Sequence, residues 1–191
     1  AGNFNQLYGR GLGLNLFENR GLAFDTWMDG VLAEYKQKYF SVKVSGGTVE
    51  ACDSVFIAKT ERYALRTASA EFYPLRGVKA GVAYIYAEGR IPQAVGEKRL
   101  KTEIPGLFAE YSNDQMAVYI DYSLKRSNLL DDNTTAWGNG IFASFSYYKD
   151  AWSVTLDYKN YRFDPRDPFE RDDFGRASKA LPFQNGPIVH K

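Results

Sequence analysis

Apolar and polar residues alternate along most of this chain, and the alternating runs meet in pairs at very short turns. The turns fall at Gln37-Lys38, Leu75-Arg76-Gly77, Asn113-Asp114 and Lys149-Asp150, and longer polar stretches separate the pairs. A period of two predicts β-strands, because successive side chains of a strand point to opposite faces. The predicted strands are residues 7–17, 27–36, 39–49, 64–74, 78–88, 104–112, 116–126, 138–148 and 151–161.

The two faces of the predicted strands differ sharply in charge. On one face, Arg66 and Glu88 are the exceptions to an otherwise apolar surface, and both lie near the loop-side ends. A charge facing lipid near the middle of a membrane costs about 2–4 kcal/mol for Arg or Lys, so the segregation predicts that the apolar face meets acyl chains. The opposite face carries Glu34, Lys36, Lys43, Glu71, Lys79, Glu110, Asp121, Lys125, Asp157 and Lys159.

Aromatic residues on the apolar face are sorted by height. Rings such as Phe72 and Trp152 lie beside the short turns, Tyr84 and Tyr122 lie toward the long loops, and aliphatic residues fill the space between. Two aromatic belts around an aliphatic band match the two interfaces of a membrane. A soluble lipocalin-like barrel or a β-sandwich would show the same alternation with the apolar face inside, and it stays the alternative.

Short turns at one end of the strands and long loops at the other indicate an all-β fold, an antiparallel up-and-down transmembrane β-barrel in a bacterial outer membrane. The ninth predicted strand runs into a polar stretch with no returning strand. An open edge in hydrocarbon would leave backbone groups unpaired. We therefore expect residues 1–191 to be a single outer-membrane barrel domain that is incomplete at the C-terminus and belongs to a larger barrel.

The opening of the chain resembles a known family. Residues 4–22 read FNQLYGRGLGLNLFENRGL, and Met28-Asp29-Gly30-Val31 follow. This glycine-rich start, the acidic-basic loop and the Asp-Gly-Val strand are similar to a poorly characterised, porin-like outer-membrane β-barrel family of Bacteroidota and related bacteria. The resemblance covers best the first 35 or so residues. It implies a barrel with further strands after Lys191 and no catalytic residues.

Composition and charge narrow the chemistry. Lys plus Arg (24) nearly balance Asp plus Glu (23), so no net field favours a nucleic-acid partner. The single His190 cannot serve a histidine-based triad, and the lone Cys52 leaves no thiolate set for zinc. Acidic residues between Asp164 and Asp173 alternate with arginines, which favours solvated ion pairs over calcium binding. The sequence predicts no enzyme, no metal and no cofactor.

The polar face supplies the candidate functional residues. As a channel lining, it predicts a porin-like path for small polar solutes, while the long extracellular loops could instead dock a surface or periplasmic protein partner in a larger assembly. Inward aromatics could stack solutes or pack against a segment folded into the pore. Membrane lipid is the partner expected outside the wall. The predicted pore-lining residues are Lys43, Lys79, Glu110, Asp121, Lys125, Asp157 and Lys159.

Overall fold

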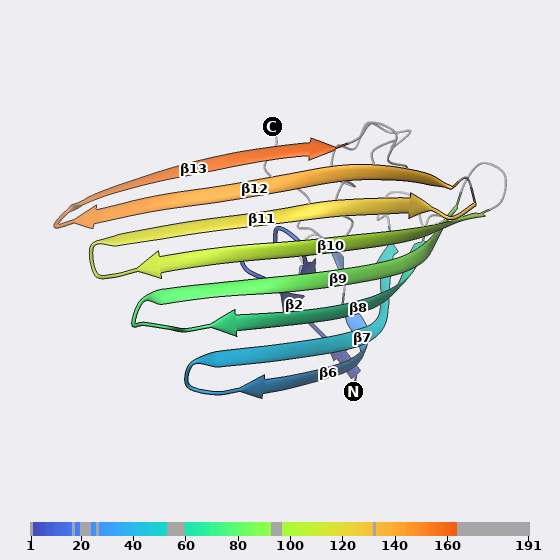
Figure 1. Cartoon of the computed structure of the whole chain (residues 1–191), viewed down its shortest axis with the longest axis horizontal. Helices are drawn as coiled ribbons and strands as arrows, with labels where there is room; N and C mark the ends of the chain where they lie inside the picture. The colour runs from blue at the N-terminus through green and yellow to red at the C-terminus, as the bar shows by residue number, and fades with distance from the viewer. Residues whose placement is uncertain are drawn as a thin grey trace.

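A computed structural model describes residues 2–16, 18–19, 24–25, 27–52, 60–92, 97–131 and 133–163 of the 191-residue chain. Nine strands form one sheet in the order β1-β6-β7-β8-β9-β10-β11-β12-β13, and every pair is antiparallel (Figure 1). From β6 onward, each strand pairs with the next along the chain, which is an up-and-down connection. Within the described ranges, no helix is long and apolar enough to cross a bilayer. The sheet strands are β1 (Gly2–Phe4), β6 (Met28–Lys36), β7 (Phe40–Cys52), β8 (Thr60–Phe72), β9 (Val78–Pro92), β10 (Glu97–Ser112), β11 (Met116–Leu129), β12 (Thr134–Lys149) and β13 (Trp152–Phe163).

Tight turns close the hairpins at one end of the sheet, the left end in Figure 1. Asn113 holds one of them, because its side-chain oxygen accepts hydrogen bonds from the backbone N–H groups of Gln115 (2.9 Å) and Met116 (2.8 Å). Gly77 and Asp150 adopt left-handed φ angles of 79° and 49° at two others. Glycine and aspartate tolerate this conformation better than most residues do.

The outward and inward faces are as the charge pattern predicted. Leu156 is 63% exposed and Phe145 37% exposed on the outer face, whereas Asp121 (4%) and Lys125 (0%) are buried on the inner face. A soluble barrel would reverse these values. The all-β, up-and-down fold is therefore confirmed, with the apolar face turned outward.

The first predicted strand is wrong. Residues 7–16 do not belong to the nine-stranded sheet, and residue 17 lies outside the described residues; β1 (Gly2–Phe4) pairs with β6 instead, and the chain then turns inward. Left-handed φ angles at Gly9 (57°) and Gly11 (90°) interrupt what alternation alone indicated as one extended strand. Residues 6–16 form a small hairpin, named the inner hairpin here, in which β2 (Gln6–Leu7) pairs with β3 (Asn15–Leu16). A separate two-stranded sheet joins β4 (Glu18–Asn19) to β5 (Phe24–Asp25).

The other predicted strands exist, and all of them except 27–36, which matches β6, are too short on the long-loop side. The structure begins β8 at Thr60 and β10 at Glu97, and it extends β9 to Pro92. Polar and charged residues in these extensions interrupt the apolar alternation that predicts a strand. The extensions carry several arginines on the outer face, among them Arg62, Arg90 and Arg99.

Candidate functional site on the inner face of the sheet

The inner hairpin is a compact turn with its own backbone hydrogen bonds. The N–H of Tyr8 donates to the carbonyl of Leu14 (3.1 Å), and the N–H of Gly11 donates to the carbonyl of Tyr8 (2.8 Å). Figure 1 shows β2 against the far side of the sheet from the viewer, behind β8 and β9. The hairpin therefore occupies the side that faces the lumen.

Apolar residues dock the hairpin against the wall. Leu14 is fully buried and Leu16 is 2% exposed. Burying a leucine side chain contributes about 1.5–3 kcal/mol, so these two residues give the hairpin a substantial share of its docking energy. Their cluster also includes Tyr8 and the wall residues Met28, Val49, Tyr63, Leu65, Ile85, Ala87, Leu100 and Ile104.

A hydrogen-bonded network ties the start of the hairpin to β7 and β8. The hydroxyl of Ser45 donates to the side-chain oxygen of Gln6 (2.7 Å), and the amide nitrogen of Gln6 donates to Thr67 (3.2 Å). The hydroxyl of Tyr8 also hydrogen-bonds Thr67. All four side chains are buried, so the network satisfies polar groups that would otherwise be costly to enclose.

A second anchor ties the turn of the hairpin to β11. The backbone N–H of Arg10 donates to the hydroxyl of Tyr119 (2.7 Å), which in turn donates to a carboxylate oxygen of Asp121 (2.8 Å). Backbone N–H groups of Arg10 and Leu12 also donate to Asp121. The guanidinium of Arg10 lies 4.3 Å from the centroid of the Tyr119 ring, within cation–π range. Asp121 is thus a binding point for the hairpin backbone.

Gly9 is required at this anchor. A Cβ atom there would lie 2.7 Å from Oδ2 of Asp121 and would also collide with the Tyr119 hydroxyl, and the φ angle of 57° disfavours any other residue. Gly9 thus belongs to a glycine-rich segment that approaches the wall closely.

Removing the Tyr119 hydroxyl should loosen the hairpin. Tyr119→Phe leaves the ring under Arg10 but removes the hydroxyl that accepts from the Arg10 N–H and donates to Asp121, and the loss of these hydrogen bonds in a buried site costs about 1–3 kcal/mol. We expect trypsin to cleave after Arg10 faster in the folded, full-length variant than in the wild type. Tyr148→Phe is the matched control, since Tyr148 is 46% exposed on the same face. Equal cleavage rates in Tyr119→Phe and wild type would remove the hydroxyl from the docking account.

The predicted pore-lining residues fall into three groups on the inner face. Lys43 lies 3.4 Å from Glu34, and Lys79 lies 3.4 Å from Glu71, close to the short turns. Glu71 also accepts a hydrogen bond from Tyr73 (2.6 Å), which raises the pKa of the Tyr73 hydroxyl. Glu110, half-buried, is in register with Lys79 and Tyr119.

Asp121 and Lys125 form the second group, and both are buried on β11. The third group is Asp157 and Lys159, which lie exposed on β13. The Nζ atom of Lys159 is 5.5 Å from the centroid of Phe142. The structure therefore does not gather the seven residues into one cluster; it distributes them along the wall.

The rest of the inner face carries aromatic rings and hydroxyl groups. The inward aromatics Phe108 and Tyr119 stack with centroids 6.1 Å apart, and Phe142 lies 6.0 Å from Tyr119, beneath the turn of the hairpin. The acidic stretch 164–173 and His190 lie outside the described residues, as does any returning strand after Phe163. The buried hydroxyl side chains are Ser41, Ser45, Thr67, Ser69, Thr102, Ser123, Ser127, Ser144 and Ser146.

An antiparallel wall with an apolar outer face, aromatic belts and a polar inner face defines an outer-membrane β-barrel. No protein-family model and no curated protein matches the sequence. Among solved structures, the fold is similar to in-vitro folded OmpT, an outer membrane protein of Vibrio cholerae in its trimer form. The TM-score is 0.58 at 12% identity, over 78% of this chain and 53% of that one. The chain thus spans about half the length of OmpT, and its likeness to that protein is consistent with the predicted place in the bacterial outer membrane.

The prediction that the chain is not an enzyme is wrong. The matching structure, OmpT, transfers only the fold at 12% identity, and an outer-membrane barrel is a scaffold that does not itself determine activity. The residue types in the sequence argue only against histidine-based and zinc chemistry. They do not exclude a catalytic role for the inward carboxylates.

Proposed function

We propose that this protein is an outer-membrane channel for small polar solutes, in which the inner hairpin narrows the lumen. The observation that carries the proposal is the polarity of the inner face. Hydroxyl groups and paired charges line this face, while the apolar face of the sheet points outward. Lining polarity of this kind sets selectivity in membrane barrels. We also infer that the chain is part of a larger barrel, within the porin-like family that its opening residues resemble.

In this proposal the seven distributed residues have different roles. Lys43, Lys79, Glu110, Asp157 and Lys159 face the part of the lumen that the hairpin leaves uncovered. Asp121 holds the backbone of the hairpin in place, and Lys125 lies buried beside it on the same strand. The five residues that face the uncovered lumen would determine ion selectivity. Asp121 and Lys125, beside the inner hairpin, would determine the width of the lumen.

Charge reversal at Lys79 tests the lining. Lys79→Glu places a carboxylate next to Glu71, within the 3.4 Å spacing of the present ion pair, so the local field becomes negative. We expect planar-bilayer recordings of the full-length protein to show a reversal potential displaced toward cation selectivity. Lys149→Glu is the control, because Lys149 ends β12 at a short turn on the outside of the lumen. If the folded wild-type protein shows no discrete conductance, the channel proposal is contradicted.

A second candidate is a barrel that docks a protein partner. The observation in its favour is the inner hairpin, which fills part of the lumen with an apolar cluster rather than with water-exposed charges. Extraction in mild detergent separates the two: a stoichiometric companion together with no conductance favours the assembly role.

A further inference from the structure

The outer face changes character toward the long loops. Arg66, Tyr86, Glu103 and Arg126 lie opposite one another on β8, β9, β10 and β11, and Trp137 of β12 completes the row. Arg66 is directly opposite Tyr86, a ring on the long-loop side of the outer face. Tyrosine rings mark the height of lipid headgroups, so Arg66 lies near the membrane interface.

Basic residues gather at and beyond this row. Arg62, Arg90 and Arg99 are exposed and in register on three adjacent strands. Asp131 lies 3.3 Å from Arg99 and offsets part of the charge.

Aromatic rings hold these cations against the wall. Arg66 lies 5.7 Å and Lys101 5.1 Å from the centroid of Tyr86, while Arg126 lies 5.5 Å from that of Trp137. Glu103 forms ion pairs with two of these cations, at 3.0 Å from Lys101 and 3.6 Å from Arg126. Within the described part of the chain, Arg66 has its ring contact but no ion pair with a carboxylate. Arg66 is therefore the cation best placed to accept an external anion.

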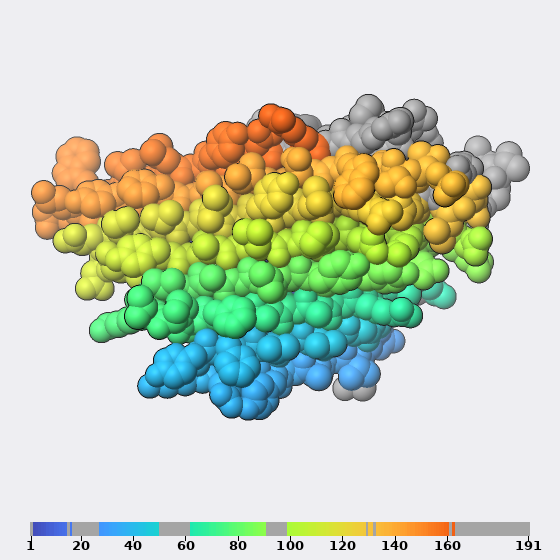
Figure 2. Space-filling model, viewed as in Figure 1, coloured from blue at the N-terminus to red at the C-terminus, as the bar shows by residue number. Residues whose placement is uncertain are grey.

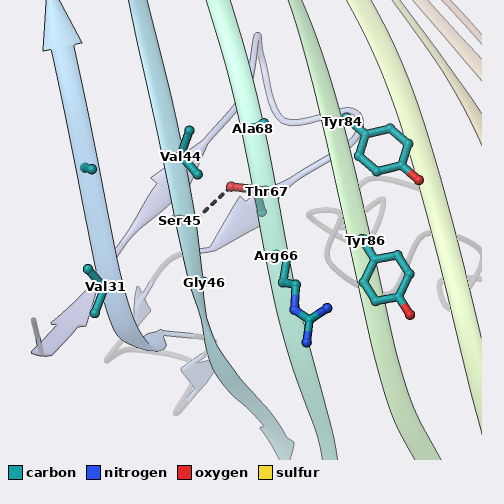
Figure 3. Close-up of a pocket in the computed structure, with 10 residues that line it drawn as sticks. Val31, Val44, Ser45, Gly46, Arg66, Thr67, Ala68, Tyr84 and Tyr86 are labelled. Atoms are coloured by element: carbon teal, nitrogen blue, oxygen red, sulfur yellow. Dashed lines mark hydrogen bonds between the residues drawn. The ribbon is translucent and has the colours of Figure 1, made fainter.

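Directly below Arg66, small side chains leave a groove in the outer wall. Its volume is about 650 Å³. Val44, Gly46 and Ala68 form a floor between the taller Val31 on one side and Tyr84 on the other (Figure 3). Figure 3 shows Arg66 at the end of this floor beside Tyr86, on the opposite side of the strands from the hydrogen bond between Ser45 and Thr67. In the whole-molecule view, this face forms the broad surface of the sheet (Figure 2).

We propose that this groove binds one phosphorylated lipid of the leaflet on the long-loop side. An acyl chain lies along the floor formed by Val44, Gly46 and Ala68, and the phosphate pairs with Arg66. Charge complementarity selects this occupant, because the apolar groove ends in the cationic side chain of Arg66, which lies beside Tyr86. The site is on the outer wall and does not depend on the proposed channel.

Native mass spectrometry of the full-length protein in detergent tests the site. The probes are dioleoylphosphatidate, dioleoylphosphatidylcholine with the same chains, and inorganic phosphate. The wild type should retain phosphatidate in preference to phosphatidylcholine. Removing the charge with Arg66→Gln should weaken phosphatidate binding about fivefold, while Arg66→Lys keeps most of it. Ala68→Phe should fill the groove and reduce the binding of both lipids.

Arg76→Gln is the matched control, because Arg76 is an exposed arginine at a short turn, at the other membrane edge. It should leave phosphatidate binding unchanged. The proposal is overturned if Arg66→Gln and Ala68→Phe retain phosphatidate as the wild type does. It is also overturned if inorganic phosphate competes as well as the lipid does, which would mean a simple anion site. Loss of an oligomer in Ala68→Phe with lipid binding unchanged would assign the groove to a second copy of the chain.

Discussion

Replacing Gly9 by valine should release the inner hairpin and increase the single-channel conductance of the full-length protein severalfold. The φ angle of 57° at Gly9 strongly disfavours a β-branched residue, at a cost on the order of 1–3 kcal/mol. The new Cβ would also collide with Tyr119 and approach Oδ2 of Asp121 to 2.7 Å.

Two readouts together make the Gly9→Val result decisive. Trypsin cleavage after Arg10 reports whether the hairpin has left the wall, and bilayer recording reports the width of the path. Gly46→Ala is the control, since a Cβ there meets only the carbonyl of Leu65 at 3.9 Å. Rapid cleavage after Arg10 with unchanged conductance would show that the hairpin does not restrict the lumen.

A charge placed on the outer face should destabilise the folded protein strongly. Ile120→Arg introduces a guanidinium on β11 between the aromatic belts, where Ile120 is 42% exposed. The expected loss is about 2–4 kcal/mol of folding free energy in lipid vesicles, because the charge must enter hydrocarbon or distort the bilayer. Urea unfolding from vesicles, followed by tryptophan fluorescence, measures this difference.

Ser153→Arg is the control for the outer-face variant. Ser153 is exposed on the inner face of β13, so the new charge enters a polar environment. Its effect on folding free energy should stay below about 1 kcal/mol, since lumen substitutions mainly alter selectivity. Equal losses in Ile120→Arg and Ser153→Arg would mean that both faces experience the same solvent.

The sequence predicted the wall well where one face is continuously apolar. In β11 and β13, residues such as Val118 and Leu156 alternate with Asp121 and Asp157, so period and sidedness follow directly from side-chain chemistry. The short turns are also visible, because residues such as Asn113 and Gly77 have specific backbone roles.

The sequence failed where the same pattern serves two structures. Leucine and glycine alternate in residues 11–14 as they would in a strand, yet the φ angles of Gly9 and Gly11 turn this segment into the lumen. Partners that are distant in the sequence decide that outcome, and two of them, Tyr119 and Asp121, lie about a hundred positions away. The outer basic rows were missed for another reason: residues such as Arg62 and Arg90 resemble loop residues until strand pairing places them on the wall.

The most direct measurement of the account is which solvent each face of β11 meets. Single spin labels at residue 120 and at residue 117, in a Cys52→Ser background and in lipid vesicles, can be relaxed by oxygen dissolved in the bilayer or by a water-soluble nickel chelate. The label at 120 should respond mainly to oxygen, and the label at 117 mainly to the nickel chelate. The opposite response, with the label at 120 reached by the chelate and shielded from oxygen, would contradict the assignment of the two faces and with it both proposals.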